Sequence, residues 1–168
     1  MKLDFVRVAR IVGVHGIRGE LRALPLDGGP DFLAGFKTFY LDGRPVVPAA
    51  CRPHKGMALL KLDGVDDRTA AEALRGKELS IRRSDARLPD GEYFDDELIG
   101  LDVYDGETGE CVGVLSKVER YPASKVYTVR GERELLVPAV RDVFIRSIDM
   151  DNNRMDIHVW EGMAADEN

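Results

Sequence analysis

Short segments of alternating apolar and polar residues, divided by turn residues, run along most of the chain. From Ile17 to Ala23 the alternation predicts a strand in which Ile17, Leu21 and Ala23 face a core and the charged residues between them face water. Asp42-Gly43 and Lys55-Gly56 each separate two apolar segments and predict tight hairpin turns. The pattern indicates a mainly β fold.

Three prolines, Pro45, Pro48 and Pro53, fall among the strands around these turns. Proline has no backbone N–H to donate within a ladder. We therefore expect this stretch to lie at the edge of a barrel or at a bulge.

One short helix is predicted in the first half, over residues 69–74, where alanine, glutamate and leucine favour helix. Asp66 or Asp67 can cap its first turn, and Gly76 supplies the left-handed residue that ends it. A strand is expected to resume over residues 77–82.

The polar segment 84–91, which holds Pro89 and Gly91, predicts a linker between two domains. We expect small β-barrels at residues 1–83 and 92–163, followed by a flexible tail at 164–168. The second barrel is predicted to contain about six strands, at residues 101–104, 111–118, 126–129, 135–137, 144–148 and 155–160.

Composition limits the class of protein. The 168 residues are 44% hydrophobic, which is enough for a packed core and argues against a disordered chain. There is no apolar run of about 18 residues and no secretory leader at the start, so we expect no membrane partner. Cys51 and Cys111 form no CxxC pair, which predicts neither a zinc site nor a disulfide framework and fits a reducing cytoplasm.

Charge differs between the two halves. Residues 1–88 hold 16 Lys and Arg and 11 Asp and Glu, a net charge of +5, whereas residues 89–168 hold 8 and 19, a net charge of −11. The asymmetry suggests partners of opposite character, such as RNA phosphate for the first half and a basic protein for the second. Solubility charge distributed by chance is the alternative.

Candidate chemistry is sparse. His158 falls on the polar face of a predicted strand and His54 in a turn, so both are expected at the surface. His15 is different because glycines surround it in the segment 13–20, where a tight turn between two barrel strands would need their conformational freedom. This segment lacks the GK[ST] ending of a phosphate-binding loop.

The carboxylate run 95–97 is expected to be the solvated face of a strand, because adjacent strand residues point to opposite sides and no calcium-loop pattern is present. No GxSxG serine and no cysteine beside a base occur. We therefore predict no catalytic residues, no metal and no cofactor.

Tyr93-Phe94 directly follows the linker, beside acidic residues. Aromatic side chains at a domain junction can anchor a partner, or they can seal the two barrels against each other. The sequence leaves both readings open.

Five blocks in order resemble the RimM family of ribosome maturation factors, over about residues 6–163. The blocks are Gly13-x-His15-Gly16-Ile17-Arg18-Gly19-Glu20, Asp67-Arg68 with residues 71–77, Glu92-Tyr93-Phe94 with Leu98-Ile99-Gly100, Leu136-Val137-Pro138, and Gly162-Met163.

The resemblance implies an N-terminal barrel similar to the second domain of translation elongation factors and a C-terminal PRC barrel. It also implies a non-catalytic factor that binds the free small (30S) ribosomal subunit through small-subunit protein nineteen. Family members assist head assembly and 16S rRNA processing. We expect a cytoplasmic protein that acts as a monomer.

The family's aromatic pair, implicated in subunit binding, is commonly two tyrosines. Tyr93 matches the first, whereas Phe94 replaces the second and lacks its hydroxyl, and Asp95 stands where tryptophan is often found. The segment with Gly13, His15, Gly16, Gly19 and Glu20 is expected to be structural. Candidate rRNA contacts, suggested by charge, are six arginines of the basic half: Arg7, Arg10, Arg18, Arg22, Arg82 and Arg83.

Two other classes remain open. One is a nucleotide- or sugar-processing enzyme with His15 as its base. The other is an RNA-binding module that acts on rRNA without a ribosomal-protein partner.

Overall fold

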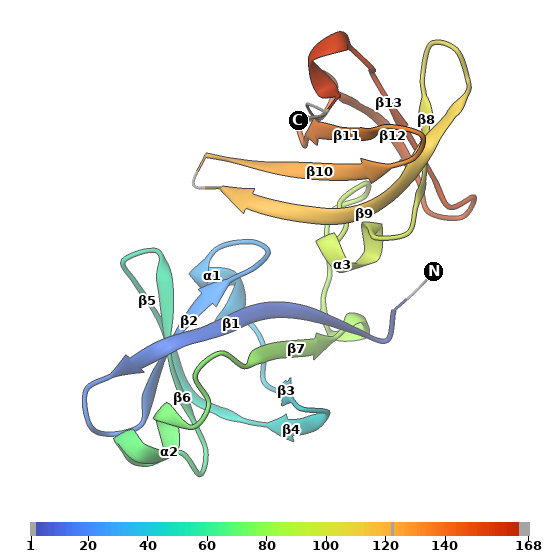
Figure 1. Cartoon of the computed structure of the whole chain (residues 1–168). Coiled ribbons are helices and arrows are strands. Elements are labelled where there is room, and N and C mark those ends of the chain that lie inside the picture. Colours follow the sequence, from blue (N-terminus) through green and yellow to red (C-terminus); the bar gives the residue numbers. More distant parts are fainter. Residues whose placement is uncertain (1–2, 122, 165–168) are drawn as a thin grey trace. The chain divides into compact units, whose positions relative to one another are not determined.

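The computed structural model describes residues 3–121 and 123–164, and the chain divides between Pro89 and Asp90 into two compact units. Both units consist mainly of antiparallel strands, so the mainly β prediction is confirmed (Figure 1). The elements of the first unit are β1 (Phe5–His15), β2 (Glu20–Pro25), α1 (Pro30–Leu33), β3 (Phe39–Leu41), β4 (Arg44–Val46), β5 (Pro48–His54), β6 (Met57–Leu62), α2 (Arg68–Glu72), β7 (Glu78–Arg82) and the 3-10 helix η1 (Arg83–Asp85).

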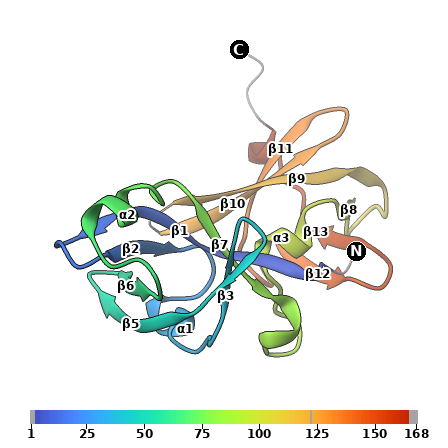
Figure 2. The same cartoon turned by 90° about the horizontal axis from the view of Figure 1, so that it is seen from below.

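The sheet of the first unit closes into a barrel, because one continuous segment of the chain forms both of its edge strands. Its strands pair in the order β4-β3-β7-β1-β2-β6-β5, which leaves β4 and β5 at the two edges (Figure 1; Figure 2 gives the view from below). These edges are successive parts of one segment, separated only by Val47, whose carbonyl accepts a hydrogen bond from the N–H of Asp63 at 2.9 Å. The unit is therefore a small β-barrel closed at a bent segment.

The three prolines lie in the two edge strands, as predicted, and the β5–β6 register shifts between Pro48 and Ala50. The two hairpin turns are confirmed as well. Asp42 and Gly43 have φ of 51° and 79°, and Lys55 and Gly56 have φ of 51° and 80°. Positive φ at both central residues matches the right-handed twist of the flanking strands.

The predicted strand from Ile17 is wrong at its start. β2 begins at Glu20, and Ile17 lies in the preceding turn with 76% of its surface exposed. Gly16 and Gly19 have positive φ, which interrupts the extended backbone that the alternation implied. Leu21 and Ala23 are buried, as predicted.

The predicted helix is present as α2. Asp67 caps it, because its carboxylate accepts a hydrogen bond from the N–H of Ala70 at 2.7 Å, and Gly76 has φ of +88° just beyond its end. The single-turn helix α1 was not predicted. It begins with Pro30 and buries Leu33.

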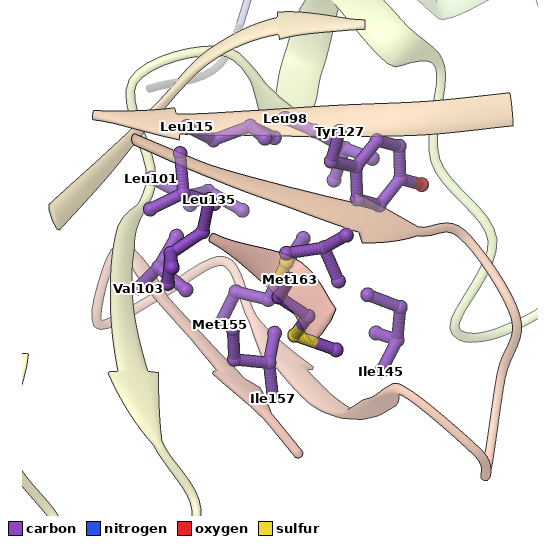
Figure 3. Packing of buried hydrophobic residues seen from close by; sticks show 12 residues of the cluster. Leu98, Leu101, Val103, Leu115, Tyr127, Leu135, Ile145, Met155, Ile157 and Met163 are labelled. Carbon is purple, nitrogen blue, oxygen red and sulfur yellow. The ribbon is translucent and has the colours of Figure 1, made fainter. Parts of the chain in front are cut away.

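The second unit is a six-stranded sheet curled around one core (Figure 3). Its strands pair in the order β11-β10-β9-β8-β13-β12, and β13 and β8 are parallel. The elements are α3 (Asp95–Leu98), β8 (Asp102–Asp105), β9 (Cys111–Tyr121), β10 (Ser124–Arg130), β11 (Glu134–Pro138), β12 (Ile145–Asp149), β13 (Arg154–Ile157) and the 3-10 helix η2 (Glu161–Met163).

The six predicted strands of this unit are all present, but the last ends at Ile157 rather than Trp160. The chain then turns back through η2, and Ala164 pairs with Leu135 on β11. Residues 165–168 of the predicted tail lie outside the described residues. Within the described ranges, no helix has the length and apolar character that a membrane crossing requires.

Candidate functional site

The glycine-rich segment 13–20 includes the turn between β1 and β2, at the barrel end where α2 packs against both strands (Figure 1). Gly19 has φ of +90°, and a Cβ there would lie 2.2 Å from the carbonyl oxygen of Val65. Gly16 has φ of +68°, and its carbonyl accepts a hydrogen bond from Arg68 at 3.2 Å. Backbone conformation and close approach therefore require glycine at position 19, and conformation favours it at 16.

His15 lies half-buried at the end of β1. Its ring centroid is 5.4 Å from that of His54, at the end of β5. Glu20 pairs with His15 in the ladder, and its carboxylate lies 3.5 Å from the guanidinium of Arg52. The end of the barrel thus holds two imidazoles beside an exposed ion pair, so the expectation of a simple surface position for His54 misses this ring contact.

His158 is half-buried as well. Its Nδ1 lies 3.4 Å from a carboxylate oxygen of Glu107 and 3.4 Å from Nη2 of Arg146, so it belongs to a small polar cluster. Among the described residues, no three His, Cys, Asp or Glu side chains are grouped so that they could hold a metal ion.

The six candidate arginines do not form one patch. β1 rises about 3.3 Å per residue over eleven residues, so its two ends are roughly 30 Å apart. Arg18 and Arg22 lie toward the glycine-rich end, whereas Arg82 and Arg83 lie by the opposite end, where Arg82 pairs with Phe5. Arg7 and Arg10 lie between them, on exposed positions of β1.

Three of these six arginines already have partners within the unit. Arg7 lies 3.1 Å from the carboxylate of Glu78. Arg82 donates to the hydroxyl of Tyr40 at 2.8 Å, and this hydrogen bond raises the pKa of its guanidinium. Arg83 donates to the carbonyl of Ala86. A contact with RNA would have to share or replace these interactions.

The two side chains of the aromatic pair, Tyr93 and Phe94, differ in their exposure. Phe94 is 1% exposed, and its N–H donates to the buried carboxylate of Glu97 at 3.0 Å. Tyr93 is half-buried and packs against the core of the second unit. Of the two rings, only Tyr93 leaves part of its surface open to a partner.

The prediction that residues 95–97 form the solvated face of a strand is wrong. They form the single-turn helix α3, in which Glu97 is buried. Asp95 accepts hydrogen bonds from Arg120 at 2.5 Å and from Lys125 at 3.0 Å. These two cations face each other across the β9–β10 ladder, so the carboxylate between them offsets their repulsion.

Sequence reasoning missed two exposed aromatic clusters. In the first unit, Phe5 and Tyr40 pack edge to face at 5.0 Å, with Arg82 over both rings. In the second, Trp160 stacks on Phe144 at 6.2 Å and is 48% exposed. The single tryptophan in an otherwise acidic half could have drawn attention, but its stacking partner is sixteen positions away.

These features define a two-barrel β protein whose chemistry resides in exposed charged and aromatic side chains. Residues 6–86 match the RimM N-terminal domain and residues 95–163 match the RimM PRC barrel domain. The chain therefore belongs to the RimM family of ribosome maturation factors, as its motifs suggested.

Relatives match over nearly their whole length. The ribosome maturation factor RimM of Caldanaerobacter subterraneus subsp. tengcongensis is 35% identical over 168 residues, which cover 95% of this chain and 99% of the relative. The ribosome maturation factor RimM of Clostridioides difficile is 34% identical, and the match covers 96% of this chain and 97% of the relative. A RimM crystal structure from Pseudomonas aeruginosa is 31% identical, with 95% and 99% covered and a TM-score of 0.46.

Proposed function

We propose that this chain is a non-catalytic assembly factor of the small ribosomal subunit. It binds the free 30S subunit through small-subunit protein nineteen, and it assists assembly of the head and processing of 16S rRNA in the cytoplasm. The observation that carries the proposal is membership of the RimM family across both units, since each half matches its own domain of that family.

The opposite net charges of the two units support different partners for each. The acidic half, at −11, suits a basic ribosomal protein, and the basic half, at +5, suits rRNA phosphate. Attraction of this kind speeds encounter and is screened beyond about 8–10 Å near physiological salt. Affinity for the subunit should therefore fall as salt rises.

Tyr93 is the residue of the aromatic pair through which we expect the protein contact to be made. Tyr93 is partly buried and packs against the core of the second unit, and such a preorganised side chain loses little freedom on binding. The backbone of the next residue is held as well, because the N–H of Phe94 donates to the carboxylate of Glu97.

The test is binding of the full chain to purified free 30S subunits, followed by sedimentation, at several salt concentrations. Tyr93→Ala should weaken binding roughly 30- to 1000-fold, the loss typical of a truncated aromatic hot spot. Tyr121→Ala is the matched control, because Tyr121 is an exposed tyrosine of the same unit. Equal binding by the Tyr93 variant and the wild type would assign this ring a purely structural role.

A second arm separates the proposal from its RNA-only alternative. Protein-free 16S rRNA and isolated small-subunit protein nineteen are offered separately to the full chain. Tight binding to the rRNA with indifference to the protein would favour an RNA-binding module. Cells that lack the gene yet accumulate no immature small subunits would contradict the assembly role itself.

A further inference from the structure

The second unit carries an exposed apolar surface that the subunit-binding proposal does not assign. It consists of Val140, Val143, Phe144 and Trp160, and it is called the tryptophan surface below. Trp160 is 48% exposed, Val143 54% and Val140 43%, whereas Phe144 is half-buried against the core. Large apolar side chains that gather at one place on a surface commonly mark an interaction site.

Local backbone contacts hold the tryptophan surface together. The N–H of His158 donates to the carbonyl of Phe144 at 2.8 Å, which joins the segment before Trp160 to the segment that bears the valines. The N–H groups of Phe144 and Ile145 both donate to the carbonyl of Val140 at 3.0 Å. The surface therefore lies on a hydrogen-bonded turn rather than on a free loop.

The indole of Trp160 is held on two sides. One side stacks on Phe144, with the ring planes 29° apart. On another, the ring lies so close to Gly162 that a Cβ at position 162 would be 2.2 Å from an indole carbon. A large, half-exposed and already ordered ring has the properties of an interface anchor, because little side-chain freedom remains to be lost on binding.

The charge around this surface indicates what covers it. Asp142 and Glu161, which follows Trp160, are exposed acidic residues beside the apolar ones. Arg141, which precedes Asp142, is exposed as well, but its guanidinium donates to the carbonyl of Gly91. The nearby Arg146 is paired with Glu107 at 3.1 Å. Because the second unit carries a net charge of −11, the surroundings of this surface favour a cationic partner over nucleic acid.

The tryptophan surface is also linked to the segment that carries Tyr93. Arg141, next to Val140, donates to the carbonyl of Gly91 at 2.6 Å, two residues before Tyr93. Tyr93 and Phe144 pack against the same core. The two aromatic positions can therefore belong to one contact.

We propose that the tryptophan surface is a docking site for a basic protein segment that bears an apolar side chain, with Trp160 as its anchor and Asp142 and Glu161 as its acidic rim. The proposal rests on the proposed function, in which that segment belongs to a protein of the small ribosomal subunit.

The experiment compares the wild-type full chain with Trp160→Ala and Val143→Ser, using free 30S subunits and, separately, the basic proteins extracted from them. Trp160→Ala should weaken binding to both probes roughly 30- to 1000-fold. Val143→Ser should weaken it several-fold and leave the thermal midpoint unchanged, because its side chain is exposed. Val47→Ser, at an exposed apolar position of the other unit, is the control and should bind normally.

The outcomes separate the two proposals. Normal binding by Val143→Ser and by a folded Trp160→Ala would overturn the docking site and leave the proposed function intact. Failure of the wild type to bind 30S subunits would contradict the proposed function, and the extracted proteins would then test the surface alone. Loss of binding to protein-free 16S rRNA in these variants would identify an RNA contact, and a Val143-dependent dimer in sedimentation would identify a second copy; either would overturn the proposal.

Discussion

Gly13 lies opposite Arg22 in the β1–β2 ladder, and the Arg22 guanidinium occupies the space into which a side chain at position 13 would project. A Cβ on Gly13 would lie 2.3 Å from Nη2 of Arg22. The Nε of Arg22 is buried and finds no hydrogen-bond partner among the described residues. The ladder register also shifts between Ile11 and Gly13, so the glycine belongs to an irregular part of the strand.

Gly13→Ala should therefore destabilise the first unit by displacing the arginine, at a cost of about 1 kcal/mol. In an Arg22→Ala background the same change should be neutral or slightly stabilising, since alanine is favoured over glycine within a strand. A double-mutant cycle by urea unfolding measures the coupling. Equal effects of Gly13→Ala in both backgrounds would show that the guanidinium does not require the glycine.

Gly19→Ala should cost more than Gly64→Ala. Both glycines have φ near +90°, so each substitution should lower stability by about 1–2 kcal/mol because alanine is strained in the left-handed region. Only at position 19 would the new methyl group meet the backbone of Val65, which should add roughly 1–3 kcal/mol. Thermal or urea unfolding of the two variants checks the difference, and indistinguishable stabilities would argue against a close approach of the turn to residues 65–66.

Asp95→Ala should destabilise the second unit by roughly 1–2 kcal/mol, because Arg120 and Lys125 would face each other without the carboxylate. The matched control is Glu92→Ala, which makes the same change of net charge at an exposed position. High salt should reduce the difference between the Asp95 variant and the wild type, because it screens the repulsion. A loss no larger than that of the control would mean that α3 is held by packing alone.

We expect the carboxylate of Asp156 to make a pH-dependent contribution to the stability of the second unit. Arg154 donates to it from Nε at 3.1 Å and Nη2 at 2.8 Å, Ser147 donates at 3.0 Å, and these hydrogen bonds lower the pKa of the carboxyl group. Because the folded pKa lies below the unfolded value of about 3.9, the stabilisation is fully present above that pH and is lost as pH falls through the folded value.

Asp156→Asn should accordingly lower the free energy of unfolding at pH 7 by less than about 1 kcal/mol, as for other exposed ion pairs. The difference from wild type should shrink as acid unfolding is followed toward pH 3. Asp151→Asn, at an exposed turn position, should show no comparable trend. A gap between Asp156→Asn and wild type that stays constant with pH would exclude the ion pair as its source.

The sequence by itself determined the mainly β fold, the hairpin turns and the capped helix α2, because each depends on local chemistry. Asp42-Gly43 favours positive φ, proline cannot donate within a ladder, and Asp67 caps the amides directly after it. The ordered motifs also sufficed to identify the family. The strand predicted from local alternation was wrong at Ile17, because the positive φ of the neighbouring glycines places this residue in a turn.

Only the tertiary structure decided which side chains share a surface. It buried Phe94, placed Asp95 between two cations on β9 and β10, and stacked the exposed Trp160 on Phe144 from another segment. It also separated arginines that composition had grouped together. These outcomes depend on strand order and on the curl of each sheet, which bring together residues too far apart in the chain for local pattern to relate them.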